Sequence, residues 1–314
     1  MLKVFLLILL LLLTLDAKDI KPTFKLKSIG FVSDFVVVKD KIYVASDEGV
    51  VEVFDLKSQK VIEFIALEPL TRKNGELQAQ RILSIDYFNG KLLLVTIGES
   101  AYRSVWIYEN HNFKKIIDES SKLTIKEARF VNDEQIFLAT FDSEIVLYDS
   151  SESYALYREH ISQSTLGDMV LSEDRKSVIS ADESGEIQRR DINSAKPLQS
   201  FQAQNLDNVY HVAHAKDVIL TAGQDRRVGI YKQGEKATHI KSNFLVYCVG
   251  ISPDAKVGIY SSGEESHLQL FDIKTKKRLD KLVGHKAIIN QIKFINEKEL
   301  FSSERGRYVY YWRI

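Results

Sequence analysis

Three carboxylates recur at one position of short apolar segments, and together they could bind a cation. Asp34, Glu127 and Asp168 each stand two residues after the first aliphatic residue of their segment. The same position in four further segments holds Ser84, His211, Cys248 and Gln291. Carboxylate oxygens are the ligands that hard cations such as calcium prefer. The alternative is a hydrated polar lining without an ion, and the residue types alone leave both open.

Other residues that could do chemistry are scattered. The seven histidines are His111, His160, His211, His214, His239, His267 and His285. His211 and His214 are three apart in a strand-like segment, which predicts that they point to opposite faces. The sequence has no G-x-S-x-G, H-E-x-x-H or glycine-rich phosphate motif. Cys248 stands in an apolar segment, so we expect a packed thiol. We therefore expect no enzyme activity, no catalytic residue and no cofactor.

The elements that would position these residues form an internal repeat. Seven strand endings carry a central residue at regular intervals, namely Phe54, Tyr108, Tyr148, Arg190, Tyr231, Phe271 and Trp312. After a first interval of 54 residues the spacings are 40, 42, 41, 40 and 41. The segments alternate apolar and polar residues, which indicates strands rather than helices. A repeat of this length built from strands predicts a ring of sheets.

Each repeat begins with an apolar strand, followed by a tight turn and a second apolar strand. The turns contain Asp, Asn, Gly or Pro, as in FNG at 88–90 and SPDA at 252–255. Second strands are predicted over Lys41–Ser46 and over 218–221, and fourth strands over 60–65 and 278–283. Seven four-stranded units of this kind predict an all-β, seven-bladed propeller over residues 18–314.

The chain stops in the third strand of its last unit, VYYWRI at 309–314. The fourth strand of that unit must therefore come from elsewhere. Thr23–Ile29, which reads TFKLKSI, alternates and belongs to no other unit. We predict that this N-terminal strand completes the last blade, so that neither end of the ring leaves an open edge.

The composition and the first residues of the chain limit the possible binding partners and the possible cellular compartment. The chain has 314 residues, 45% of them hydrophobic, with 43 basic and 43 acidic side chains. This balance argues against nucleic-acid binding, which needs a basic surplus. Lys3 followed by the apolar run 4–15 is short for a membrane span and typical of a secretory signal, with cleavage after Ala17. We expect a periplasmic monomer without stable membrane insertion after cleavage. An uncleaved membrane anchor is the alternative.

The residues that recur at equivalent positions of the seven units resemble those of the WD-repeat family of propellers, over essentially all of residues 18–314. Phe54-Asp55, Tyr148-Asp149 and Phe271-Asp272 stand where that family has Trp-Asp. Gly284-His285, Ser302 and Trp312 match its buried hydrogen-bond relay in one blade. Other blades depart from the pattern, so the resemblance implies this relay only for the last blade.

The chain more narrowly resembles the exported L-type accessory proteins of ε-proteobacterial periplasmic nitrate reductases. The shared features are a bare secretory signal, a short seven-bladed propeller with weak Trp-Asp dipeptides, and a composition rich in Lys and Ile. The resemblance implies a helper of reductase assembly or activity that has no catalysis of its own. A scaffold for another envelope complex is the first alternative. An exported propeller hydrolase or lactonase is the second, and it would need metal ligands clustered at the central channel.

A cluster of basic residues predicts where a protein partner binds. In a propeller, the loops that join blades and the loops between second and third strands share one face, here called the inter-blade face. We place on it Arg72, Lys73, Tyr102, Arg103, Arg226, Arg227, Arg305 and Arg307, with Tyr308. Arg and Tyr are enriched where interfaces concentrate their binding energy, and long loops commonly carry binding. An ordinary solvated surface is the alternative.

Overall fold

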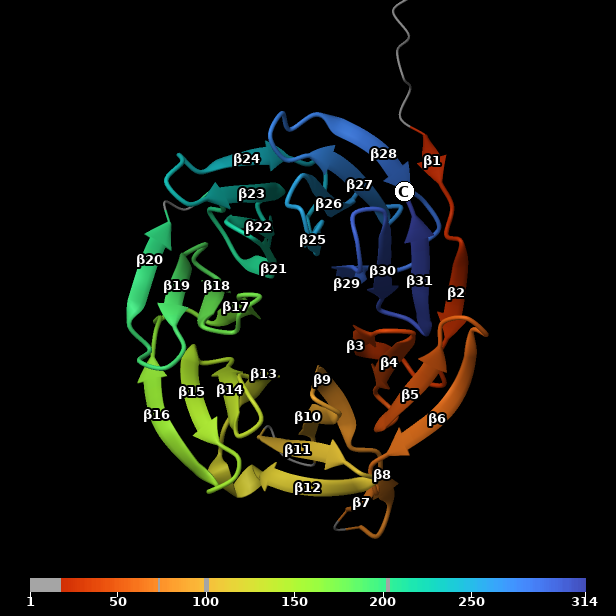
Figure 1. Ribbon diagram of the computed structural model, residues 1–314, viewed down its shortest axis with the longest axis vertical. Helices are drawn as coiled ribbons and strands as arrows, with labels where there is room; N and C mark the ends of the chain where they lie inside the picture. The colour runs from red at the N-terminus through yellow and green to blue at the C-terminus, as the bar shows by residue number, and fades with distance from the viewer. Residues whose placement is uncertain (1–17, 73, 99–101, 202–203) are drawn as a thin grey trace, which may run out of the picture.

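A computed structural model describes residues 18–314 except 73, 99–101 and 202–203, and the predicted signal segment 1–17 lies outside it. Seven sheets follow one another around a central axis, as Figure 1 shows. This confirms the predicted seven-bladed all-β propeller. One single-turn helix, η1 (Glu119–Ser121), is present in the described part of the chain. No helix among those residues is long and apolar enough to cross a membrane.

The four strands of each blade run from the axis outward. The inner strands are β3 (Val32–Val38), β9 (Arg81–Phe88), β13 (Ile125–Phe130), β17 (Leu166–Leu171), β21 (Val209–Ala215), β25 (Val249–Ile251) and β29 (Ile289–Phe294). The second strands are β4 (Lys41–Ser46), β10 (Lys91–Ile97), β14 (Gln135–Thr140), β18 (Ser177–Asp182), β22 (Val218–Gly223), β26 (Val257–Ser262) and β30 (Glu299–Glu304). All residues of β18 and β22 are buried, because neighbouring blades cover both faces of each sheet.

The third strands contain the seven central residues that recur at regular intervals in the sequence. They are β5 (Val50–Asp55), β11 (Arg103–Glu109), β15 (Glu144–Asp149), β19 (Ile187–Asp191), β23 (Arg227–Lys232), β27 (His267–Asp272) and β31 (Tyr308–Arg313). The outer strands of blades 1 to 6 are β6 (Lys60–Ala66), β12 (Asn112–Ile117), β16 (Tyr154–His160), β20 (Pro197–Phe201), β24 (Thr238–Lys241) and β28 (Arg278–Leu282). A hairpin of β7 (Leu70–Thr71) and β8 (Leu77–Gln78) extends the loop between blades 1 and 2.

The N-terminal strand completes blade 7, as predicted. Strand β2 (Phe24–Lys27) pairs antiparallel with β31, so Phe24 lies opposite Tyr311. The two rings stack with centroids 4.6 Å apart, and Tyr311 contacts Phe301 at 5.0 Å. Leu26, on the same strand, is buried in the apolar cluster between blades 7 and 1. The closure therefore combines main-chain hydrogen bonds with an aromatic core.

An additional strand was not expected. β1 (Asp19–Ile20) pairs in parallel with the outer strand of blade 6, so that this sheet has five strands (Figure 1). The backbone N–H groups of Lys281 and Val283 donate to the carbonyls of Lys18 and Ile20 at 3.0 and 2.9 Å. β1 thus covers the edge of β28 before the chain crosses to blade 7, which protects that edge from pairing with other chains.

Blade 7 contains the buried relay that the sequence predicts for it. The indole N–H of Trp312 donates to the Ser302 hydroxyl at 2.7 Å, and His285 Nε2 lies 2.7 Å from that hydroxyl. His285 Nδ1 lies 3.0 Å from the Glu304 carboxylate, which also accepts from the Tyr310 hydroxyl at 3.0 Å. Because the carboxylate only accepts, Nδ1 carries the imidazole proton and Nε2 accepts from Ser302. Burial lowers the pKa of His285 despite the neighbouring carboxylate.

Candidate functional site

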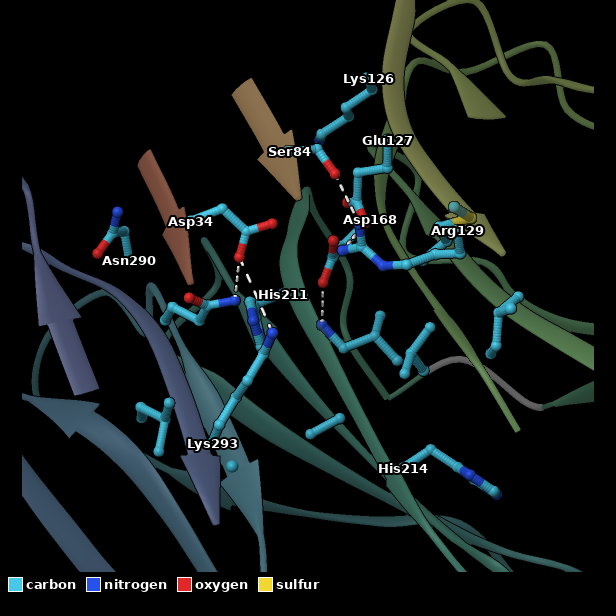
Figure 2. A pocket seen from close by; sticks show the side chains of 18 of the residues that line it. Asp34, Ser84, Lys126, Glu127, Arg129, Asp168, His211, His214, Asn290 and Lys293 are labelled. Atoms are coloured by element: carbon cyan, nitrogen blue, oxygen red, sulfur yellow. Dashed lines mark hydrogen bonds and ion pairs between the residues drawn. The ribbon is translucent and has the colours of Figure 1, made fainter. Parts of the chain in front are cut away.

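The central channel is a cavity of about 660 Å³ lined by polar and apolar side chains of the inner strands. Figure 2 shows Asp34, Glu127, Asp168 and His211 directed into it from four blades. Ser84 and Gln291 line the same cavity. Six of the seven residues that share one sequence position are thus brought together. Cys248, the seventh, is fully buried in the apolar cluster of blades 6 and 7, and burial raises its pKa well above the usual thiol value.

A β-bulge in the inner strand aims these side chains. In blade 1 the register shifts between Val32 and Asp34, and in blade 4 it shifts between Leu166 and Asp168. Blades 2, 3, 5 and 7 have a register shift at the equivalent place. A bulge bends the strand and turns the residue that follows, which directs a polar side chain toward the axis instead of into the core.

The channel side chains join neighbouring blades. Oδ2 of Asp34 accepts from the backbone N–H of Ile85 in blade 2 at 2.9 Å, and Asp168 accepts from that of Val212 in blade 5 at 2.6 Å. Oε1 of Gln291 accepts from the backbone N–H of Phe35 in blade 1 at 3.0 Å. The acceptor and donor positions are the same in all three bonds. Asp34, Asp168 and Gln291 therefore each hold the inner strand of the next blade.

Glu127 differs from the other carboxylates because its neighbours include both a cation and an acid. Arg129 donates to Glu127 at 2.7 Å and to the Ser84 hydroxyl at 2.6 Å, as the dashed lines of Figure 2 show. Burial and, to a smaller extent, the nearby Asp168 carboxylate raise the pKa of Glu127 to about 8, against the lowering effect of Arg129. Glu127 therefore holds a proton at neutral pH.

The two histidines of blade 5 both line the channel, although they come from opposite faces of β21. The inner strand presents its edge to the axis, and so residues of both faces reach the same cavity. Figure 2 shows His214 well apart from His211. Burial lowers the pKa of His211 to about 4, so its ring is neutral at neutral pH. His214 is half-buried in the channel lining and not in the apolar core.

The proposed cation ligands are in use as hydrogen-bond acceptors. Asp34 also accepts from the Gln291 amide and has Lys293 Nζ at 3.9 Å, and Glu127 is paired with Arg129. In the described part of the chain, no three His, Cys, Asp or Glu side chains are grouped as a metal ion would require. The geometry therefore favours a role in joining the blades for Asp34 and Asp168, whereas Glu127 is paired with Arg129 of its own strand.

The residues predicted for partner binding fall into two groups. Arg72, Arg226, Arg305 and Arg307 are exposed. Arg307 stacks over Phe31 with its guanidinium carbon 5.8 Å from the ring centre, and Arg72 bonds Gln78. Lys73 lies outside the described residues.

The other group has structural contacts. Arg227 is half-buried, donates to the Gln204 carbonyl at 2.8 Å and has Asp225 at 3.5 Å. Arg103 lies over Phe141 at 5.9 Å, and Tyr102 beside it is half-exposed. Tyr308 is also half-exposed and receives Lys25 over its ring at 4.8 Å. Charge reversal at Arg227 would therefore disturb folding as well as the surface.

Exposed apolar side chains on the same face were missed by the sequence analysis. Phe31 is 54% exposed, Leu77 71% and Leu206 68%, and each lies in a connection between two blades. Ile29 in the connection from blade 7 to blade 1 is 45% exposed. A sequence shows that such residues are apolar, but it does not show that the neighbouring blades leave them uncovered.

Comparison with known proteins identifies the fold and no more. No protein-family model and no curated protein matches the sequence. Among solved structures, a chain of the mitotic checkpoint complex superposes with a TM-score of 0.77 at 14% sequence identity, over 95% of this chain and 93% of that chain. That chain is a WD-repeat propeller, so the WD-like architecture is shared. The comparison does not support the narrower resemblance to reductase accessory proteins.

Proposed function

We propose that the protein is a non-catalytic scaffold that binds a protein partner through its inter-blade face. Propellers of this architecture commonly mediate contacts between proteins. The observation that carries the proposal is the exposed, unpaired charge beside exposed apolar residues. Among the described residues, the guanidinium groups of Arg226 and Arg305 have no hydrogen bond or ion pair, and Phe31 and Leu206 are exposed on the same face. Arginine and large apolar side chains together are typical of interface centres.

The partner that we propose is a periplasmic nitrate reductase subunit, and the compartment is the periplasm. The support is the sequence resemblance and the signal-like residues 1–17. The different-class alternative, a propeller hydrolase, would need clustered metal ligands, and residues 18–314 offer no such group where they are described. Metal analysis of the purified protein is the direct test of that alternative.

The test is co-purification with the reductase after charge reversal at two exposed positions. Arg226→Glu with Arg305→Glu should leave the circular dichroism and melting temperature unchanged, because neither side chain supports the fold. The variant should lose the reductase subunits from a pull-down of the tagged protein. Lys57→Glu with Lys274→Glu is the matched control, since these exposed lysines lie in turns on the opposite face. Unchanged co-purification of the arginine variant would reject this face.

A further inference from the structure

Blade 6 departs from the repeat at its inter-blade end. In the other six blades the first aliphatic residue of the inner strand pairs with the second strand, as Val32 does with Ser46 and Ile289 with Glu304. The equivalent residues of blade 6, Val246 and Ser262, are not paired. Here β25 first pairs at Val249, opposite Tyr260, while Ser262 pairs only with the third strand.

Beyond Val249 the strands of blade 6 keep one main-chain bond, from the N–H of Ser261 to the Cys248 carbonyl at 2.9 Å, and a serine side chain adds two more. The Ser261 hydroxyl accepts from the backbone N–H of Tyr247 at 2.8 Å and from that of Cys248 at 3.2 Å. A hydroxyl between the strands satisfies these donors without closing the ladder. Ladder pairing between the two strands therefore ends before Val246 and Ser262, at the inter-blade end of the blade.

A second cavity of about 130 Å³ lies at this end of blade 6. Its lining is mainly apolar, with Phe244, Leu245, Tyr247, Ile288 and Ile289 as the large side chains. Ser262 and Ser266 add hydroxyls near one wall. Glu264 is the one charged residue that lines it, and the carboxylate of this exposed residue has no ion pair in the described part of the chain.

The aromatic wall of this cavity is fixed before any ligand arrives. Tyr247 stacks on Tyr210 of blade 5 with ring centres 5.5 Å apart and planes inclined by 21°. Phe244 meets the Tyr247 ring edge-on at 6.4 Å. The Tyr210 hydroxyl in turn donates to Gln224 at 2.6 Å. A wall whose rings are held by their neighbours loses little conformational freedom on binding.

We propose that the cavity of blade 6 binds a lysine or arginine side chain presented by a protein partner. The methylene stem of such a side chain would pack on Leu245, Ile288 and Ile289, because long basic side chains bury their stems along apolar surface. Its charged head would meet the Glu264 carboxylate, the one charged side chain among the described residues that line the cavity. This proposal rests on the proposed scaffold function. It specifies that the protein partner inserts one basic side chain into the cavity.

Charge decides between this ligand and its competitors. An acidic side chain would face the Glu264 carboxylate without a cation in the lining. A purely aliphatic side chain would fill the cavity but would leave that carboxylate without a partner. The nearby Arg305 bonds Ile288 through its backbone N–H but does not line the cavity.

The test uses capped tripeptides as probes on the intact folded protein, observed by two-dimensional NMR. Gly-Lys-Gly and Gly-Arg-Gly at millimolar concentration should shift the amide signals of Gly263 and Ile288. Gly-Nle-Gly and Gly-Glu-Gly should shift them much less. Glu264→Gln should weaken binding about threefold, the effect expected of an exposed charge pair. Glu265→Gln, the adjacent exposed carboxylate, is the matched control and should bind as the wild type does.

A filling variant makes the outcome independent of charge. Ser262→Phe should abolish the peptide shifts and keep the melting temperature. Equal binding of the norleucine peptide, equal binding by Glu264→Gln, or no shift with either basic peptide would each overturn the proposal. The Arg226 and Arg305 pull-down separates the two levels. Loss of the reductase there with no basic-peptide binding here leaves the scaffold function standing and refutes the pocket.

Discussion

The Asp34 carboxylate of blade 1 accepts the backbone N–H of Ile85 in blade 2 at 2.9 Å. The same carboxylate accepts from the Gln291 amide of blade 7, so a single side chain connects three consecutive blades. Asp34 is only 6% exposed. Removing a buried acceptor between blades is costly, because hydrogen-bond donors on two neighbouring blades are then left without a partner.

Replacing Asp34 with alanine should therefore destabilise the ring. We expect a loss of about 3 kcal/mol, since the buried N–H of Ile85 and the Gln291 amide lose a charged acceptor. Urea unfolding followed by circular dichroism measures this loss. Asp40→Ala, in the exposed turn that follows the same strand, should change stability by less than about 0.5 kcal/mol. Equal effects of the two variants would contradict the inter-blade role.

Ser302→Ala should break the relay of blade 7. The substitution leaves the buried Trp312 indole N–H without an acceptor and removes the donor to His285. We expect a loss of about 2 to 3 kcal/mol. Fluorescence in a Trp106→Phe background, which leaves Trp312 as the one tryptophan, reports the site directly. An unchanged Trp312 spectrum together with unchanged stability would show that the relay does not contribute.

Glu127→Gln should change how stability depends on pH. The folded-state pKa of Glu127, about 8, lies above the unfolded value near 4.3. The folded wild type therefore binds the proton of Glu127 more tightly than the unfolded chain does. This contribution to the free energy of unfolding is complete below about pH 4.3 and is lost as the pH rises from there through 8. The glutamine variant keeps its neutral side chain. Its stability relative to the wild type should therefore increase over that window, by the order of 2 kcal/mol or more.

Urea midpoints at several pH values between 4 and 9 test this difference. Glu159→Gln makes the same charge change on an exposed outer strand and should give a flat difference. A flat difference for Glu127→Gln as well would mean that the channel does not hold a proton at neutral pH.

The N-terminal strand gives a prediction about processing. The backbone nitrogen of Lys18 donates to Asp280 at 2.8 Å. If export removes residues 1–17, this nitrogen becomes an ammonium group paired with that carboxylate, and the pairing should stabilise β1.

Hydrogen exchange of the Lys281 and Val283 amides reports the opening of β1, because both donate to it. In mature protein that begins at Lys18, Asp280→Asn should speed this exchange severalfold at pH 6.5. Acetylating the terminus should have a similar effect, and the two changes together should add little. No effect of Asp280→Asn on either amide would contradict the pairing.

Much of this fold could be read from the sequence, because a repeat reports the same constraint seven times. The second strand Lys41–Ser46 has the predicted bounds, and the fourth strand of blade 1 extends the prediction by one residue to Ala66. The closing strand was found because an alternating segment belonged to no unit. β1 was missed because two residues carry no measurable alternation.

The channel was only partly predictable. The common sequence position identified Asp34, Glu127 and Asp168 as neighbours of the axis, but the hydrogen bonds of Asp34 and Asp168 to the next blade depend on a bulge that the composition does not reveal. The raised pKa of Glu127 depends on its burial and on the proximity of the Asp168 carboxylate, and a repeat pattern contains neither of these. Glu304 was missed as the last acceptor of the relay because the resemblance covers only Gly284-His285, Ser302 and Trp312.

The pairing of β2 with β31 also fixes the order in which the molecule can be completed. Phe24 and Tyr311 stand at opposite extremes of the covalent chain, yet they share a sheet. Because β31 is synthesised after β2, strand β2 has no pairing partner in blade 7 until β31 has been made. Contacts so distant in sequence form slowly. The ring therefore cannot close until both Phe24 and Tyr311 have been made.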